Sequence, residues 1–363
     1  MPELDRYFEL MLDKGASDLH LSVGYPPMLR LRGVLVPASD DVLTKARMLP
    51  LLDELLDDKR RETFHRLKDL DFAYALGDRA RFRCNYLYKH TGPGAVFRTI
   101  PSEILSAEQL DLPESIVRLA DRRSGLVLVT GPTGSGKSTT LAALISHINH
   151  HGRGHILTIE DPVEFVHKPA RCLVTHREVG LDAPTFADAI RSAGRENADV
   201  ILVGELRGAE TMRLAVQLAS YGILIFATVH TNSATSTISR FINAFPRAQQ
   251  DAIRRMLSES LAGIVAQQLL KRADGSGRVA AHEVLVGTPG VQAAIREGKT
   301  SMLTSLMQSG LGDGMQLMDT VLERLVTEGK VTAEAALEKA LDKETFSALP
   351  LVKEQLGEAA ILG

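Results

Sequence analysis

Residues 126–140 read LVLVTGPTGSGKSTT, an apolar run followed by a glycine-rich segment and then by a second apolar periodicity. The segment contains the complete pattern G-x-x-x-x-G-K-[ST], which runs from Gly131 to Ser138. Val127–Val129 reads as a buried strand, and the apolar residues after Ser138 recur at helical spacing. A glycine-rich turn that matches by chance is the alternative, and the complete motif between a strand and a helix disfavours it. We therefore predict a phosphate-binding loop at a strand-to-helix turn.

This loop supplies the predicted nucleotide-binding residues. Small residues allow the backbone to approach phosphate groups, and the helix N-terminus favours anions. The Lys137 ammonium is expected to reach the β- and γ-phosphates of a nucleoside triphosphate, and the Ser138 hydroxyl is expected to hold Mg²⁺. The predicted nucleotide-binding set is Gly131, Thr133, Gly134, Ser135, Gly136, Lys137, Ser138 and Thr139.

Composition limits the class of protein. The 363 residues are enough for two domains with separate cores. A formal charge of −3 and a pI near 6.4 predict no general attraction to nucleic acid or anionic lipid. Two cysteines cannot form a disulfide framework, so a reducing, cytoplasmic setting is expected. There is no signal peptide and no apolar run of membrane-spanning length, so membrane association is expected only through a partner.

The first hundred residues alternate between helical and strand periods, which predicts an α+β domain over residues 1–100. Residues 101–124 read as a linker, and residues 125–363 as a second domain. Helices are expected over residues 4–12 and 44–67. Strands are expected over residues 19–23, 28–36, 79–86 and 95–100, with the last of these following a turn at residues 91–94.

An arginine-rich strand lies in the first domain. The period of two places Arg79, Arg81 and Arg83 on one face, and Arg98 joins them from the partner strand. From spacing alone, a solvated strand face is the favoured interpretation, and an anion-binding face is the alternative.

The second domain alternates strand and helix, which predicts a mostly parallel sheet covered by helices. In such sheets ligands bind at the carboxyl ends of the strands. Chemically active residues follow four expected strands, so we predict that they converge on the nucleotide. These strands are residues 127–130, 156–159, 200–203 and 224–229. A hairpin turn at residues 274–277 is expected before a further strand over residues 279–286.

The groups after these strands suggest catalytic roles. Glu205 is placed to support the metal ion, whereas Asp199 lies at the other end of its strand. Glu164, close to Glu160 and Asp161, is the predicted general base.

His230, beside hydroxyl side chains at a strand end, is predicted to sense the γ-phosphate rather than to be a core histidine. Lys137 is the only cation that the sequence clearly places at the nucleotide. Arg81 and Arg83 are therefore predicted to complete a neighbouring subunit's site in a ring.

With these residues identified, the sequence resembles type IV pilus retraction ATPases of the twitching-motility (PilT) type, within the secretion ATPase superfamily. The resemblance covers nearly the whole chain. Its motifs are Ser17-Asp18-Leu19-His20-Leu21, Arg81-Phe82-Arg83, the phosphate loop, the aspartate box at 158–165, the atypical Walker B segment at 199–205, the histidine box at 227–231, and the segments at 267–269 and 296–300.

The resemblance implies a PAS-like N-terminal domain and a RecA-like ATPase domain. It implies a homo-hexamer that hydrolyses ATP with Mg²⁺ and depolymerises a pilin filament, working with an inner-membrane platform protein. It also makes Glu164 the catalytic glutamate and Glu205 the Walker B acid. Residues 194–199 and 219–223 depart from the family pattern, which leaves a main motor and an accessory paralogue both open.

Other function classes remain as alternatives. Members of the similar superfamily that extend pili or serve type II secretion usually carry a tetracysteine zinc motif, so its absence here implies retraction. A RecA-like nucleic-acid motor is disfavoured by the acidic pI. A scaffold protein that binds ATP without hydrolysing it is a further alternative.

Overall fold

The computed structural model describes residues 2–31, 33–77, 79–100 and 103–362, with side chains up to residue 357. The chain divides into two compact units. The first comprises Met1–Ile104 together with Asp161–Val166, and the second comprises Leu105–Glu160 and His167–Gly363. No helix within the described ranges is long and apolar enough to span a membrane.

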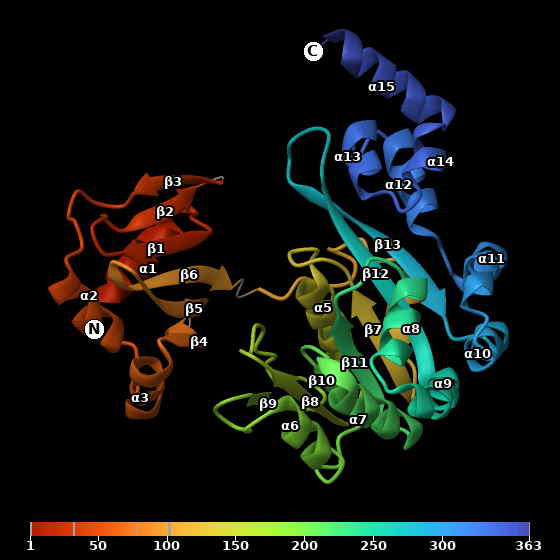
Figure 1. Ribbon diagram of the computed structural model, residues 1–363, viewed down its shortest axis with the longest axis horizontal. Helices are drawn as coiled ribbons and strands as arrows, with labels where there is room; N and C mark the ends of the chain where they lie inside the picture. Colours follow the sequence, from red (N-terminus) through yellow and green to blue (C-terminus); the bar gives the residue numbers. More distant parts are fainter. Residues whose placement is uncertain (1, 32, 78, 101–102, 363) are drawn as a thin grey trace. The chain divides into compact units, whose positions relative to one another are not determined.

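The first unit is built on a six-stranded antiparallel sheet in the order β3-β2-β1-β6-β5-β4 (Figure 1). Alternate strand residues face a core in which the ring of Phe8 stacks on that of Phe82 at 4.3 Å. The elements are α1 (Glu3–Lys14), β1 (Asp18–Ser22), β2 (Met28–Leu31), β3 (Val34–Pro37), α2 (Lys45–Asp53), α3 (Asp58–Leu67), β4 (Asp69–Leu76), β5 (Ala80–Lys89) and β6 (Gly92–Ile100).

Two expectations for this unit were wrong in detail. The predicted helix over residues 44–67 is interrupted, because the Asp57 side chain accepts a hydrogen bond from the Arg60 amide at 2.8 Å and starts α3 as a new helix. The predicted turn at residues 91–94 is shorter, because β5 and β6 remain paired as far as Lys89 and Gly92. Gly94 therefore belongs to β6, where an added Cβ would lie 2.8 Å from the Leu21 carbonyl oxygen.

The second unit contains a seven-stranded sheet in the order β13-β12-β7-β11-β10-β8-β9 (Figure 1). All neighbouring pairs are parallel except β12 and β13, so the predicted mostly parallel sheet is confirmed. The strands are β7 (Gly125–Thr130), β8 (His155–Glu160), β9 (Leu173–Glu178), β10 (Val200–Val203), β11 (Leu224–Val229), β12 (Leu261–Lys271) and β13 (Arg278–Val286).

Helices pack on this sheet and continue beyond it into a C-terminal group with its own apolar cluster. Residues 105–124 form part of the second unit and contain α4 (Glu114–Ala120), which buries Ile116 and Leu119. The other helices are α5 (Lys137–His151), α6 (Phe186–Ala193), α7 (Gly208–Ser220), α8 (Ala234–Asn243), α9 (Arg247–Ser260), α10 (Pro289–Arg296), η1 (Thr300–Met302), α11 (Leu303–Ser309), η2 (Gly310–Asp313), α12 (Met318–Thr327), α13 (Ala333–Lys339), α14 (Lys343–Ser347) and α15 (Pro350–Leu362).

Candidate nucleotide site

The carboxyl ends of four parallel strands lie side by side in the second unit. Thr130 of β7 pairs with Val229 of β11, so the phosphate loop and His230 follow neighbouring strands at the same level. Val203 of β10 pairs with Ile159 of β8 in the same way. The strand ends therefore meet at one edge, as parallel pairing requires.

The phosphate loop connects β7 to α5, and two of its glycines lie against β12. Gly131 has φ 144°, and an added Cβ would lie 2.3 Å from the carbonyl oxygen of Gln267. Gly136 has φ 88°, and an added Cβ would lie 2.8 Å from the Gln267 side-chain nitrogen. Only glycine fits both the backbone conformation and the space, so β12 fixes the shape of the loop.

Gln267 also holds the loop by hydrogen bonds. Its Nε2 donates to the Ser135 carbonyl oxygen at 2.7 Å, and its Oε1 accepts from the Thr140 hydroxyl at 2.8 Å. All three residues are buried. The sequence prediction mentioned Gln267 only within a family segment, although a buried amide in the apolar run of β12 is itself a signal of a specific polar partner.

Lys137 begins α5 and is buried, with a residue exposure of 8%. Its ammonium donates to the carbonyl oxygens of Gly131 and Pro132, each at 2.9 Å. The hydroxyl of Ser135 is buried and has no hydrogen-bond partner among the described residues. The Lys137 ammonium is thus bonded to carbonyl oxygens of the loop itself, and the Ser135 hydroxyl lies buried in the loop without a hydrogen-bond partner in the described part of the chain.

A threonine network joins the base of the loop to the histidine box. The Thr130 hydroxyl donates to the Thr231 carbonyl oxygen at 2.6 Å and accepts from the Thr231 amide at 2.8 Å. The Thr231 hydroxyl in turn lies 2.6 Å from that of Thr237 in α8. The last residue of β7, directly before the loop, is therefore hydrogen-bonded to the residue after His230.

Glu205 and His230 are brought together at this edge. His230 Nε2 lies 3.1 Å from Glu205 Oε1, and an Arg207 guanidinium nitrogen lies 2.8 Å from Glu205 Oε2. Burial acts to raise the pKa of Glu205, but the hydrogen bond and charge of Arg207, together with His230, lower it below its usual value. Glu205 is therefore an ionised carboxylate. Arg207, which was not among the residues predicted from the sequence, is thus a cation held beside Glu205.

The aspartate box is divided between the units, with Glu160 ending β8 and residues 161–166 packing in the first unit. There, Arg81 Nη2 donates to the Val163 carbonyl oxygen at 3.1 Å, and an Arg83 guanidinium nitrogen lies 3.7 Å from a carboxylate oxygen of Glu164. The structure thus brings Glu164 and the two arginines together.

Arg79 does not join the other two arginines. It precedes β5, outside the strand ladder, and its guanidinium lies 3.4 Å from the carboxylate of Glu9 in α1. The predicted face of three arginines is therefore reduced to Arg81 and Arg83, with Arg98 opposite Arg83 on β6.

Asp199 lies at the opposite edge of the sheet, where its Oδ2 accepts a hydrogen bond from the His155 amide at 2.8 Å. Residues 194–199 and 219–223, where the family pattern is broken, precede β10 and β11 at that same edge. The two segments that differ from the family pattern thus lie at the sheet edge opposite the one that carries the phosphate loop.

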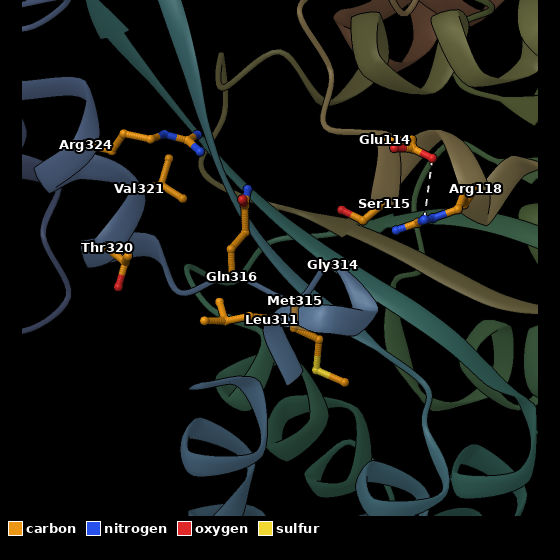
Figure 2. Close-up of a pocket in the computed structure, with 10 residues that line it drawn as sticks. All are labelled: Glu114, Ser115, Arg118, Leu311, Gly314, Met315, Gln316, Thr320, Val321 and Arg324. Carbon is orange, nitrogen blue, oxygen red and sulfur yellow. Dashed lines mark hydrogen bonds and ion pairs between the residues drawn. The ribbon is translucent and has the colours of Figure 1, made fainter. Parts of the chain in front are cut away.

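A separate pocket of about 360 Å³ lies between α4, the segment around Gly314, and α12. Figure 2 shows Arg118 and Arg324 at its borders and Gln316 between them. None of its lining residues belongs to the predicted nucleotide set, so this pocket is distinct from the phosphate loop.

Comparison with known proteins places the chain among secretion ATPases. The family model described as "Type II/IV secretion system protein" matches residues 6–306. The type IV pilus retraction ATPase PilT of Pseudomonas aeruginosa is 47% identical over 333 residues, which are 92% of this chain and 96% of that protein. A twitching motility protein of Neisseria gonorrhoeae is 44% identical, over 88% of this chain and 86% of its own.

A solved structure supports the same relationship. The crystal structure of the pilus retraction motor PilT with bound ADP superposes with a TM-score of 0.87 at 40% identity. The match covers 94% of this chain and 98% of the other. The α/β fold is therefore shared over almost the full length of both chains.

Proposed function

Because this chain belongs to the Type II/IV secretion system protein family, we propose that it hydrolyses ATP to drive retraction of a type IV pilus. Its nearly full-length match to a pilus retraction ATPase confirms the predicted family resemblance and the prediction of an ATPase. The observation that carries the proposal further is the phosphate loop held by Gln267 beside the Glu205–His230 pair.

The loop residues fit a nucleotide. Gly131 and Gly136 allow the loop to pack against β12, where a Cβ would collide, and the buried, unsatisfied Ser135 hydroxyl fits a phosphate oxygen as its partner. The N-terminus of α5 favours a negative charge. Lys137 would exchange its two loop carbonyls for the β- and γ-phosphates, while Gly131, Thr133, Gly134, Ser135, Gly136, Ser138 and Thr139 complete the cradle.

Ser138 and the ionised Glu205 would hold Mg²⁺, since a hydroxyl and a carboxylate are the oxygen ligands that this ion prefers. When bound, the ion would neutralise charge on the transferred phosphoryl group. His230 lies 3.1 Å from Glu205, so its ring can contact the metal-supporting carboxylate while it senses the γ-phosphate. Glu164 would accept the proton of the attacking water.

The arginines would stabilise the transition state. We propose a homo-hexameric ring in which Arg81 and Arg83 complete a site, and two arrangements are distinguishable. In the first, they act on the neighbouring subunit's nucleotide. In the second, they act beside Glu164 of their own chain, an arrangement that the 3.7 Å contact between Arg83 and Glu164 favours.

The domain proposal has residues 1–100 as a PAS-like domain, residues 101–124 as a linker and residues 125–363 as a RecA-like ATPase domain. The proposed partners are an inner-membrane platform protein and, through it, the pilin filament. The protein would work in the cytoplasm at the base of the pilus machine, with membrane contact only through partners and without nucleic acid.

Steady-state phosphate release by the purified protein tests the chemistry. Lys137→Ala should abolish tight ATP binding or turnover. Glu164→Gln keeps the side chain's shape but removes its basicity, so hydrolysis should become slow while nucleotide stays bound. Asp199→Asn is the matched acidic control at the opposite edge. Unchanged phosphate release by the Lys137 variant would refute the phosphate-loop assignment, and a loss of binding in the Glu164 variant would make that residue structural.

Mixing the variants tests the arrangement of the arginines. Rings made from Arg83→Ala and Glu164→Gln subunits regain activity if each arginine serves a neighbour, because some interfaces then carry neither defect. No recovery in rings shown to contain both subunits means that the arginines act within one chain or only solvate their strand.

A deletion strain tests the biological role. Loss of a retraction motor should leave cells hyperpiliated without twitching, whereas bald cells would indicate pilus extension. Hyperpiliation with residual twitching would indicate an accessory paralogue. Binding to single-stranded DNA at low salt would instead support a nucleic-acid motor.

A further inference from the structure

A row of charged residues crosses the polar face of the first sheet. Cross-strand pairing aligns Arg30 of β2 with Asp18 of β1, Asp18 with Arg98 of β6, and Arg98 with Arg83 of β5. The row ends at Glu164, 3.7 Å from Arg83. The row therefore runs from residues 17–21, a family motif of unassigned role, to Glu164, the proposed general base. Charges along it alternate in sign except where Arg98 lies next to Arg83.

Asp18 is the buried member of this row. Only 7% of its side chain is exposed, against 67% for Arg98. Its Oδ1 accepts from Arg98 Nε at 2.9 Å, its Oδ2 accepts from the Ser17 hydroxyl at 2.7 Å, and Arg30 Nε lies 3.8 Å from Oδ2. Burial acts to raise the pKa of Asp18, but Ser17 and Arg98 lower it below its usual value, so the carboxylate is ionised.

Arg98 stands directly between Asp18 and Arg83. Residues directly opposite in an antiparallel pair have Cβ atoms about 5 Å apart, and like charges there are unfavourable. Asp18 and Arg83 lie on opposite sides of Arg98 in the strand order. The Asp18 carboxylate therefore draws the Arg98 guanidinium toward β1, which leaves Arg83 as the guanidinium next to Glu164.

We propose that Asp18 is a positioning residue for the Arg83–Glu164 pair and acts by anchoring Arg98. This inference rests on the proposed function of Glu164 and Arg83. Without the anchor, Arg98 competes with Arg83 for Glu164 and displaces it from the geometry required for hydrolysis. Such a role explains why this carboxylate is buried among arginines whose own side chains are much more exposed.

The test measures steady-state phosphate release by the full chain. Asp18→Asn keeps the shape and removes the charge, and kcat should fall about 10-fold, because small misplacements of catalytic groups are costly. The KM for ATP should be unchanged, since the phosphate loop is not altered. Asp71→Asn is the matched control. It removes a carboxylate of β4 that accepts a hydrogen bond from Asn85 Nδ2 at 3.1 Å, and kcat should stay at the wild-type value.

The decisive variant is Asp18→Asn combined with Arg98→Gln. Removal of the competing guanidinium should make the double variant faster than Asp18→Asn alone, an effect that a purely structural role of Asp18 would not produce. A double variant that is equal to or slower than Asp18→Asn overturns the inference.

Melting temperatures identify misfolded variants. If Asp18→Asn does not fold, Ser17→Ala is used instead, because it removes the hydroxyl that holds the same carboxylate, and a smaller fall in kcat is expected. Wild-type kcat in a folded Asp18→Asn or Ser17→Ala variant overturns the inference alone. Wild-type kcat in Glu164→Gln and Arg83→Ala would instead overturn the proposed function on which it rests.

Discussion

Replacement of Gln267 by leucine tests how the phosphate loop is held in shape. The amide makes two buried hydrogen bonds, to the Ser135 carbonyl oxygen in the loop and to the Thr140 hydroxyl in α5. Leucine has a similar volume but neither donates nor accepts. The substitution therefore removes the polar link between β12 and the loop while filling the same space.

The magnitude follows from the two lost bonds. At about 1 kcal/mol net for each hydrogen bond, their removal costs about 2 kcal/mol. If this loss falls on the binding-competent conformation of the loop, nucleotide affinity should decrease about 30-fold. A larger loss is expected if Ser135 and Thr140 are left unpaired, because an unsatisfied buried polar group costs about 1–3 kcal/mol.

The assay is equilibrium titration with a fluorescent ATP analogue, combined with a thermal melt. Gln268→Leu is the matched control, since Gln268 is the next residue of β12, is also buried, and has no side-chain hydrogen bond among those found for the described residues. The Gln267 variant should bind weakly and the Gln268 variant normally. Equal affinities for the two variants would refute the reasoning.

Two further substitutions test buried and paired charges. Arg207→Gln should raise the pKa of Glu205 toward its ordinary value; because the native pKa is lowered, the ionised form is lost as pH falls, so the acid limb of the pH–rate profile should move to higher pH. An acid limb that does not move would contradict this. Glu283, whose pKa is raised by burial, accepts from the amides of Ala234 at 2.7 Å and Met318 at 3.3 Å, at the starts of two helices. Glu283→Gln turns a donor toward one amide, so a thermal melt should show destabilisation of about 1–3 kcal/mol, and an unchanged melting temperature would exclude this link.

Local sequence patterns were sufficient for the elements around the predicted phosphate loop. The apolar run before Gly131 and the helical spacing after Ser138 predicted β7 and α5, and the structure confirms both. Period-two alternation likewise placed Arg81 and Arg83 on one face of the predicted strand, and Phe82 and Cys84, which alternate with them, are buried. These predictions succeed because strand and helix periods are properties of neighbouring residues.

Several local expectations failed where a specific side-chain contact competed with the pattern. The helical period over residues 44–67 continued through the cap at Asp57, and Arg79 continued the alternation of β5 although it lies outside the ladder. Arg207 was overlooked because a loop residue has no period, and its role depends on Glu205 being held beside it. Side-chain partners decide each of these positions.

By itself, the sequence determined the alternation of strands and helices and the family to which the chain is similar, and it predicted a phosphate loop between β7 and α5. The tertiary structure alone decided that Gln267 holds a loop more than 130 residues away, since that contact requires β12 to lie beside β7. It also decided that Asp18, Arg98 and Arg83 form one row. Hydrophobic periodicity fixes which face of a strand is buried, but the order and register of strands in a sheet depend on packing of the whole chain, and that order places distant polar groups together.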